Sequence, residues 1–377
     1  MKPLAVAAWS MITPLGEDDA TIDALFERRS GFSAQTSTCK LRNPLAAVVP
    51  ARPSHVTSDG QWQRYLATYV TRKVLDTLSI NIRDRCAFVF ATSFGHLIDD
   101  GGSDTMSTWA KDVVRSVGCD LDPIVVGSGC SSGADALGVA AAMLDCETID
   151  TAIVVAVDIV TAAKRMAHST LGTMAASDHK PFDISRSGML PGEAAAAVVL
   201  MRRDDCAEHK GELVGIGASN DAFGLTAPDP SGLSVRLALE RALRAAELSY
   251  SDLALYLAHG TGTQLNDDLE AKVVEEVFAD NETLTIVGTK GALGHSLGAC
   301  GLVEFILLLQ ILSRQLAPAT VGLSDPIGCI STRFPGPEGR PLNSPFGVSV
   351  TLGFGGFNTA LIGRASAALC VPLRSLR

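Results

Sequence analysis

The chain has 377 residues and a formal net charge of −10 at pH 7, with 47% hydrophobic and 19% charged residues. This composition excludes an intrinsically disordered chain and is typical of a globular protein with a large core. The acidic balance argues against a nucleic-acid partner, because a phosphate backbone would be repelled on average. The length predicts either two domains or one large fold assembled from two halves.

Short apolar runs alternate with helical patterns along the chain, which indicates an α/β protein with buried strands. Residues 3–12 are interpreted as the first strand rather than a secretory signal, because a Thr-Pro-Leu-Gly turn follows them. The other expected strands are 87–92, 124–126, 151–157, 194–201, 253–258, 285–288 and 346–352.

Two helical segments differ in their apolar pattern. Residues 235–246 carry apolar side chains at the spacing of one helix face, which predicts an amphipathic helix. Residues 134–144 are apolar on nearly all sides, with Asp135 as the polar exception, so this helix is expected in the middle of the protein. The longest apolar stretch, 302–312, is much shorter than the roughly 20 residues that cross a bilayer, so no membrane partner is expected.

The chain shows a faint internal repeat. A buried strand, a glycine-rich turn and an apolar helix occur in this order at 125–144 and again at 286–312, and a break near 206–212 lies between them. This pattern predicts an internal duplication, with an N-terminal half at 1–205 and a C-terminal half at 206–377.

The cysteines do not form a recognisable framework. Nine of them are scattered without a Cys-x-x-Cys pair, which favours neither disulfides nor a zinc site and fits a reducing cytoplasm. Cys130 differs from the others because it lies in Gly-Ser-Gly-Cys-Ser-Ser-Gly, between a strand and the apolar helix. A thiol at a helix N-terminus is predicted to have a lowered pKa and raised nucleophilicity. The alternative is a buried, inert cysteine. The glycines and serines on both sides of Cys130 disfavour this alternative.

Two histidines and a glycine-rich turn provide possible partners for this cysteine. His259 lies in His-Gly-Thr-Gly-Thr and His295 in Gly-His-Ser-Leu-Gly, each after an apolar strand, where crevices of α/β sheets bind ligands. The glycine-rich segment 353–356 separates two strands and could bring backbone N–H groups close to a reacting carbonyl, as half of an oxyanion hole.

These motifs together resemble the β-ketoacyl-acyl-carrier-protein synthases of the KAS I/II type, in the thiolase superfamily. The resemblance rests on the order and spacing of GCSSG at 129–133, HGTGT at 259–263, TKGALGH at 289–295 and GFGGFN at 353–358, and it covers nearly the whole chain. The chain departs from the family pattern at Ser128, Gly129, Gln264, Ser296 and Phe357. The stretch between Ser93 and Cys130 is also shorter than is usual.

The resemblance implies a five-layered α-β-α-β-α thiolase-like fold of two similar halves, and a 3-oxoacyl-acyl-carrier-protein synthase activity. In such enzymes the cysteine, here Cys130, first takes an acyl group from a thioester. A malonyl thioester then loses CO2, and the resulting enolate attacks the acyl-cysteine. By the same resemblance, His259 and His295 polarise the malonyl thioester carbonyl, and the backbone N–H groups of Cys130 and Phe354 form the oxyanion hole.

Four further residues take roles by the same resemblance. Lys290 and Glu304 order the histidines electrostatically, and Thr261 and Thr263 contact the phosphopantetheine arm. The expected partners are an acyl carrier protein and a second subunit, in a homodimer or in a heterodimer with a related ketosynthase-like subunit. No metal or nucleotide cofactor is implied. The pathway, fatty-acid or polyketide and polyene synthesis, stays open.

Several assignments are secondary. Arg64, Arg72 and Lys73 are possible members of a basic patch for an acidic carrier protein, although a solvated helix face is the simpler interpretation. Met106, Trp109 and Phe94 are weak candidates for the acyl pocket and are more typical of ordinary core residues.

Two rival functions have weaker support. A serine hydrolase could use Ser131 within Gly-x-Ser-x-Gly, followed in the chain by Asp267 and His295, but it would leave Cys130 and Lys290 without a role. A non-catalytic chain-length-factor-like subunit is disfavoured because the cysteine and both histidines are present.

Overall fold

The computed structural model describes residues 1–77, 85–93, 99 and 105–366. Its principal strands form two five-stranded layers. The first runs β6 (Ile124–Val126), β5 (Cys86–Ala91), β7 (Thr151–Asp158), β8 (Ala194–Arg202), β1 (Leu4–Thr13). The second runs β11 (Thr285–Gly288), β10 (Leu253–Ala258), β14 (Phe346–Leu352), β15 (Phe357–Ala365), β9 (Gly211–Asn220). A short antiparallel pairing of β1 with β9 joins the two layers edge to edge.

Both layers have the same topology. When the strands of each layer are numbered along the chain, their spatial order is third, second, fourth, fifth, first in both. The pairings also correspond, since the first three strands of each order are parallel and the last two pairings are antiparallel. The repeated topology supports an internal duplication, while the exact division at 205/206 stays a prediction.

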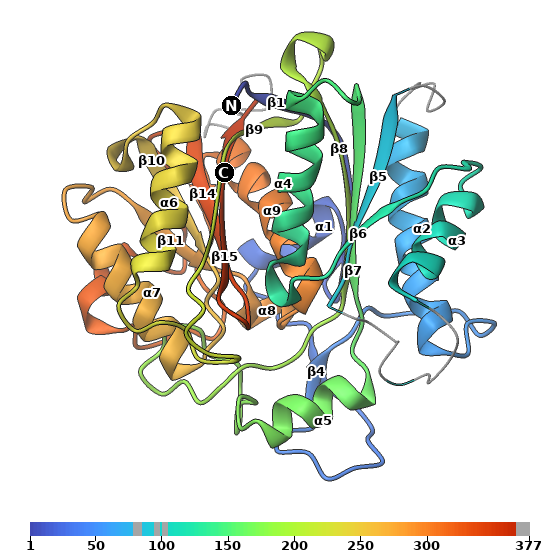
Figure 1. Ribbon diagram of the computed structural model, residues 1–377. Helices are drawn as coiled ribbons and strands as arrows, with labels where there is room; N and C mark the ends of the chain where they lie inside the picture. Colours follow the sequence, from blue (N-terminus) through green and yellow to red (C-terminus); the bar gives the residue numbers. More distant parts are fainter. Residues whose placement is uncertain (78–84, 94–98, 100–104, 367–377) are drawn as a thin grey trace.

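Helices cover both sheets and fill the space between them, which confirms the five-layered α-β-α-β-α arrangement (Figure 1). The outer layer on the first sheet is α2 (Asp59–Thr77) and α3 (Met106–Ser116), the central layer is α4 (Ser132–Asp145) and α9 (Cys300–Arg314), and the outer layer on the second sheet is α6 (Leu233–Ala246) and α7 (Gln264–Val277). The shorter elements are β2 (Gly16–Glu17), α1 (Asp19–Phe26), β3 (Phe32–Ala34), β4 (Leu45–Ala47), α5 (Ala162–Thr170), α8 (Lys290–Leu293), β12 (Leu316–Ala317) and β13 (Arg340–Pro341).

The central helix α9 is the most apolar part of the core. Among the described residues, one helical segment, Leu297–Arg314, is long and apolar enough to cross a membrane, and 94% of it is buried inside the protein. It packs against β14 and β15 on one side and against α4 on the other. Its composition is therefore explained by its place between the two sheets.

The expected strands and the two expected helices are confirmed, with ends that differ by three residues at most. Strand β9 was not among the expected strands. A Cβ on Gly215 would lie 2.3 Å from the carbonyl oxygen of Ala242, and one on Gly217 would lie 2.0 Å from that of Ala238. Helix α6 thus packs directly on the strand backbone, and the glycines are required by this contact rather than by a turn.

The two central helices approach each other through glycine. A Cβ on Gly133 of α4 would lie 2.8 Å from the backbone nitrogen of Leu302, and one on Gly301 of α9 would lie 2.7 Å from that of Ala134. The contact brings the short helix Gly129–Ser131 before α4 against the short helix Leu297–Ala299 before α9. Residues from the two halves of the chain therefore meet at the N-termini of the central helices.

We expect Gly133→Ala and Gly301→Ala each to lower the free energy of unfolding by about 1–3 kcal/mol, because each added methyl group would overlap backbone atoms that cannot rotate away. Urea unfolding followed by circular dichroism measures this change. Gly138→Ala, on the same α4, is the matched control: the nearest atom to its Cβ is 3.9 Å away, so helix propensity predicts equal or greater stability. Equal effects at all three positions would contradict the close-contact explanation.

Candidate active site

A cavity of about 540 Å³ opens where the strands of both sheets end. Six of the eight predicted site residues line it, namely Cys130, Thr261, Thr263, His259, His295 and Phe354. Cys130 follows β6, His259 follows β10, and Phe354 follows β14. The predicted crevice at the carboxyl ends of the strands is therefore present, and it contains groups from both halves of the chain.

The thiol of Cys130 is almost completely buried at the start of α4, with 7% of the residue exposed. Burial raises its pKa to about 11, although the Phe354 amide and the Lys290 ammonium favour the thiolate. The expected lowered pKa is therefore wrong for the ligand-free protein. The loss of hydration outweighs the favourable groups around the sulfur, so the resting cysteine is a neutral thiol.

The glycine turn after β14 packs on the turn that carries Cys130. A Cβ on Gly353 would lie 3.4 Å from the carbonyl oxygen of Ser128, and Gly355 and Gly356 have φ angles of +83° and +81°. The backbone N–H groups of Phe354 and Cys130 both favour a negative charge at the sulfur. Two amides are thus directed at the place where an acyl group on this cysteine would carry its oxygen.

The two predicted histidines lie side by side, with ring centroids 5.2 Å apart and ring planes at 84°. The Lys290 ammonium lies 3.4 Å from Nδ1 of His259, and the backbone N–H of Leu297 donates to Nδ1 of His295 at 3.3 Å. Because Nδ1 accepts in both rings, the hydrogen of each neutral imidazole is on Nε2. Both rings therefore offer an N–H donor to the cavity.

Both imidazoles are neutral at physiological pH. Burial, with the nearby Lys290 ammonium, lowers the pKa of His259 and of His295 well below the usual value. A neutral ring is a hydrogen-bond donor that adds no charge to the cavity. The pair can therefore stabilise a developing oxyanion without first attracting the substrate's carboxylate as an ion pair.

Lys290 and Glu304 form a buried ion pair behind the histidines, with 2.6 Å between Nζ and Oε1. The hydroxyl of Thr289 donates to the same Glu304 oxygen at 3.0 Å. Burial opposes the charge on Lys290, but Glu304 outweighs it and raises the pKa of the ammonium. Lys290 contacts His259, and Glu304 contacts Lys290 and Thr289. Neither residue lines the cavity, so both are placed to hold His259 in position.

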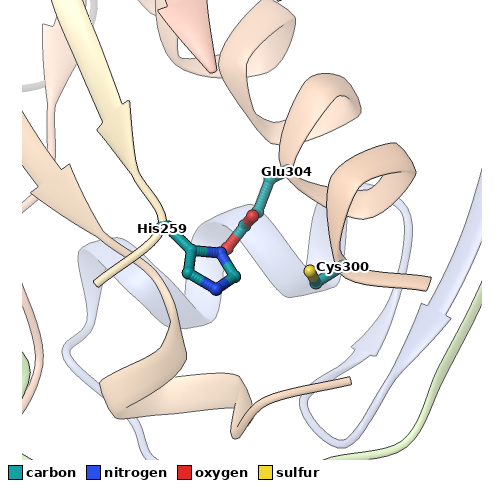
Figure 2. A group of neighbouring side chains, drawn as sticks. All are labelled: His259, Cys300 and Glu304. Atoms are coloured by element: carbon teal, nitrogen blue, oxygen red, sulfur yellow. The ribbon is translucent and has the colours of Figure 1, made fainter. Parts of the chain in front are cut away.

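The donor atoms of His259, Cys300 and Glu304 lie within 4.8 Å of one another, a grouping that could hold a metal ion (Figure 2). The ammonium of Lys290 already lies between two of them, in contact with both Glu304 and His259. A bound cation would have to displace a buried ammonium and its ion pair. The cluster therefore fits the side chain of Lys290 better than a metal.

Two buried carboxylates that the sequence analysis did not assign to the site hold the histidine loop. Glu270 of α7 accepts hydrogen bonds from the backbone N–H groups of His259 at 2.8 Å and Gly260 at 2.7 Å. Asp267, one turn earlier, accepts from the N–H of Gly262 at 3.1 Å. Their spacing of three on a helix that begins directly after the loop was the available signal.

A third carboxylate ties the two halves together. Asp158, at the end of β7, accepts from the backbone N–H groups of Ser93 and Gly298, both at 2.8 Å, and forms a buried ion pair with Lys164. Gly298 belongs to the short helix that follows His295. Asp158 therefore fixes the position of the second half's loop relative to the first half's sheet.

The structure contradicts the serine hydrolase alternative. The hydroxyl of Ser131 contacts the carboxylate of Asp135 at 2.7 Å and the carbonyl of Ser128 at 3.0 Å, and Ser131 does not line the cavity. Asp267 is bound to the loop that follows His259, and His295 accepts from its own loop. The three residues do not form a triad.

Two weak candidate assignments are not supported, and the simpler interpretation holds for the residues that the structure describes. Trp109 packs against Phe90 in the outer core with centroids 5.4 Å apart, and neither it nor Met106 lines the cavity, while Phe94 lies outside the described residues. The basic residues of α2 are engaged elsewhere: Arg64 with Asp112, Arg72 with the carbonyl of Ser116, and Lys73 with Glu17 and Asp18. They form no rim around the cavity, whose lining cations are Arg42 and Arg186.

A five-layered α-β-α-β-α fold with one cysteine and two histidines in a shared cavity defines a thiolase-like protein. Sequence models of the β-ketoacyl synthase N-terminal and C-terminal domains match residues 103–206 and 210–324. The chain belongs to the β-ketoacyl synthase family.

Known relatives agree with this membership. The chain is 33% identical over 247 residues to 3-oxoacyl-[acyl-carrier-protein] synthase 2 of Mycobacterium leprae, covering 62% of this chain and 58% of that protein. It is 31% identical over 252 residues to the mitochondrial 3-oxoacyl-[acyl-carrier-protein] synthase of Arabidopsis thaliana, covering 62% and 54%. The matches thus span little more than half the length of these relatives.

Solved structures share the fold across the whole chain. A β-ketoacyl synthase from Burkholderia phymatum has a TM-score of 0.82 at 23% identity, covering 97% of this chain and 100% of that one. A ketosynthase in complex with its chain length factor from Xenorhabdus doucetiae has a TM-score of 0.83 at 22% identity, covering 97% and 98%.

We expect alkylation of Cys130 by iodoacetamide to be slow at pH 7 and to accelerate about tenfold per pH unit up to about pH 10, because the thiolate fraction grows in that proportion below a pKa of about 11. Peptide mass spectrometry of the modified residue measures the rate. Free glutathione is the reference, whose rate levels off near pH 9. A plateau for Cys130 below pH 8 would show that the site holds a resting thiolate.

Proposed function

We propose that this protein catalyses a decarboxylative Claisen condensation between an acyl group on Cys130 and a malonyl group on an acyl carrier protein. The convergence of Cys130, His259, His295 and the Phe354 amide on one cavity carries the proposal. The family membership supports the same chemistry. These groups form two pairs. The backbone amides of Cys130 and Phe354 lie at the sulfur, and the imidazoles of His259 and His295 lie beside it.

The first half-reaction is a thioester exchange at Cys130. The sulfur attacks the acyl thioester carbonyl, and the amides of Cys130 and Phe354 stabilise the oxyanion. The bond to the carrier's sulfur then breaks, and the thiol proton of Cys130 ends on the departing thiolate. Because the resting thiol has a pKa of about 11, proton loss accompanies attack instead of preceding it.

The second half-reaction is carried by the histidine pair. The carbon–carbon bond to the malonyl carboxylate breaks, CO2 leaves, and the electron pair forms an enolate whose oxygen accepts from Nε2–H of His259 and His295. The enolate carbon attacks the acyl-cysteine carbonyl, the bond to Cys130 breaks, and the released thiolate takes up a proton from the solvent. Burial, together with the Lys290 ammonium, keeps the pKa of both imidazoles low and the rings neutral, so they act as donors throughout.

The mouth of the cavity suits a phosphopantetheine arm. Thr261 and Thr263 line it with hydroxyls 2.9 Å apart, which can pair with the amides of the arm. Arg42 is exposed, lines the cavity, and forms no ion pair with any described residue. Its guanidinium can therefore meet the phosphate of the arm and offset the chain's net charge of −10 toward an acidic carrier protein.

The subunit arrangement belongs to the same proposal. A homodimer, or a heterodimer in which this chain is the active subunit, is compatible with a neighbour that was solved as a ketosynthase with its chain length factor. Fatty-acid and polyketide pathways both use this reaction, and a cytoplasmic location without a metal or nucleotide cofactor stays a prediction.

Incubation with a panel of acyl thioesters should add one acyl group to the protein, and intact-protein mass spectrometry measures the adduct. Cys130→Ala should form none, because the other thiols lack the amide pair. His259→Ala and His295→Ala should still form the adduct but release CO2 from a malonyl thioester at least about a hundredfold more slowly. If none of the acyl thioesters forms an adduct with the wild-type protein, the proposed function is wrong.

Arg42→Ala should raise the KM for a coenzyme A or carrier-bound acyl donor about fivefold, because one charged contact to phosphate is lost. The KM for an N-acetylcysteamine thioester, which lacks the phosphate, should not change. Arg42→Lys is the control that keeps the charge. An equal rise for both donors would show that Arg42 shapes the cavity and does not bind phosphate.

A further inference from the structure

The cavity contains a third histidine that the proposed reaction does not use. His168 comes from α5, is 9% exposed, and lines the cavity together with Cys130, His295 and Phe354. Within the described part of the chain, its Nε2 forms no hydrogen bond, whereas Nδ1 lies 3.0 Å from the hydroxyl of Thr173. A polar ring atom inside a largely apolar cavity without a protein partner is a candidate for contact with a ligand.

Thr173 fixes the orientation of this ring. Besides its contact with Nδ1, the Thr173 hydroxyl lies 3.3 Å from the carbonyl oxygen of His168, so the residue is held at two points. The Nε2 edge is therefore the part of the ring left to face the cavity. A ring held in this way loses little conformational entropy when it binds a ligand.

The ring lies close to the reacting end of the acyl chain. Its centroid is 6.1 Å from that of the Phe354 ring, and the amide of Phe354 is one of the two groups directed at the Cys130 sulfur. It also interacts electrostatically with His295. A group bound at Nε2 would thus lie in the part of the cavity that Phe354, His295 and Cys130 line, on the side of the thioester.

The ring is neutral at physiological pH, because burial and then the Lys164 ammonium lower the pKa of His168 to about 4. A neutral imidazole nitrogen either donates or accepts one hydrogen bond, depending on the tautomer that Thr173 selects. A hydroxyl group can do both and therefore pairs with either tautomer. A saturated chain would instead bury Nε2 without a hydrogen-bond partner. The free energy lost by removing Nε2 from water would then exceed the free energy gained from its weak contact with the chain.

We propose that His168 forms a hydrogen-bonding subsite that selects acyl chains carrying a hydroxyl group near the thioester. This inference rests on the proposed function and names the substrate class of the same cavity. His168 is then a specificity-determining residue for the acylation of Cys130. It takes no part in the decarboxylation, which belongs to His259 and His295.

The test compares two N-acetylcysteamine thioesters of equal chain length, one saturated and one with a 3-hydroxyl group. The rate of Cys130 acylation is measured by intact-protein mass spectrometry. The wild-type protein should prefer the hydroxyacyl donor by about tenfold in kcat/KM, as expected for one hydrogen bond in a closed cavity. His168→Phe should reduce the preference to about one, and His168→Asn should keep part of it.

Thr173→Val provides an independent variant. It keeps the size of the side chain but removes the hydroxyl that contacts Nδ1, so the orientation of the His168 ring is no longer fixed. It should lower the preference with little effect on the rate for the saturated donor. Equal wild-type rates for both donors, or equal slowing of both by His168→Phe, would overturn the subsite and leave the condensation intact. No adduct with either donor would instead count against the proposed function.

Discussion

The close approach of α4 and α9 is the constraint on which the site depends. Because Gly133 and Gly301 have no side chains, the two helix backbones touch near their N-termini. The turn with Cys130 precedes one helix, and the loop with His295 precedes the other. A wider separation would leave each half with its own incomplete site. Asp158 reinforces the same junction by binding backbone N–H groups from both halves.

The electrostatics of the cavity follow from its burial. Loss of hydration drives the cysteine and the histidines to their neutral forms. The buried charges behind the histidines are concentrated in the Lys290–Glu304 pair, which is held by its own hydrogen bonds. A neutral resting site suits the proposed condensation, because both of its half-reactions create a transient oxyanion. Donors that are already in place and uncharged can stabilise that oxyanion without first reorganising.

Much of this arrangement could be predicted from the sequence, and the failures have physical causes. Apolar strands next to glycine-rich turns identified Cys130 and both histidines, since that pattern depends on local chain geometry. Strand β9 was missed because the glycines that helix packing requires there weaken the strand pattern of the sequence. The pKa of Cys130 was misjudged because burial depends on distant segments. Asp158 acts through backbone N–H groups of distant segments, which no side-chain motif records, whereas Glu270 left only its spacing from Asp267 as a signal.

The residues that line the cavity differ in how firmly they are held. The buried, fixed residues are those proposed to carry out the reaction, and the more exposed ones are those that could determine which substrate fits. His259 and His295 follow strand ends or tight turns, are 2% and 3% exposed, and are fixed by Lys290 and by backbone hydrogen bonds. Another part of the lining comes from α5 and from loops, where Leu171 and Phe354 are substantially exposed. Changes in the fixed residues would alter the position of the donors and stop the reaction. Changes in the more exposed residues would alter what fits beside Cys130, so substrate preference could vary there without loss of the proposed condensation chemistry.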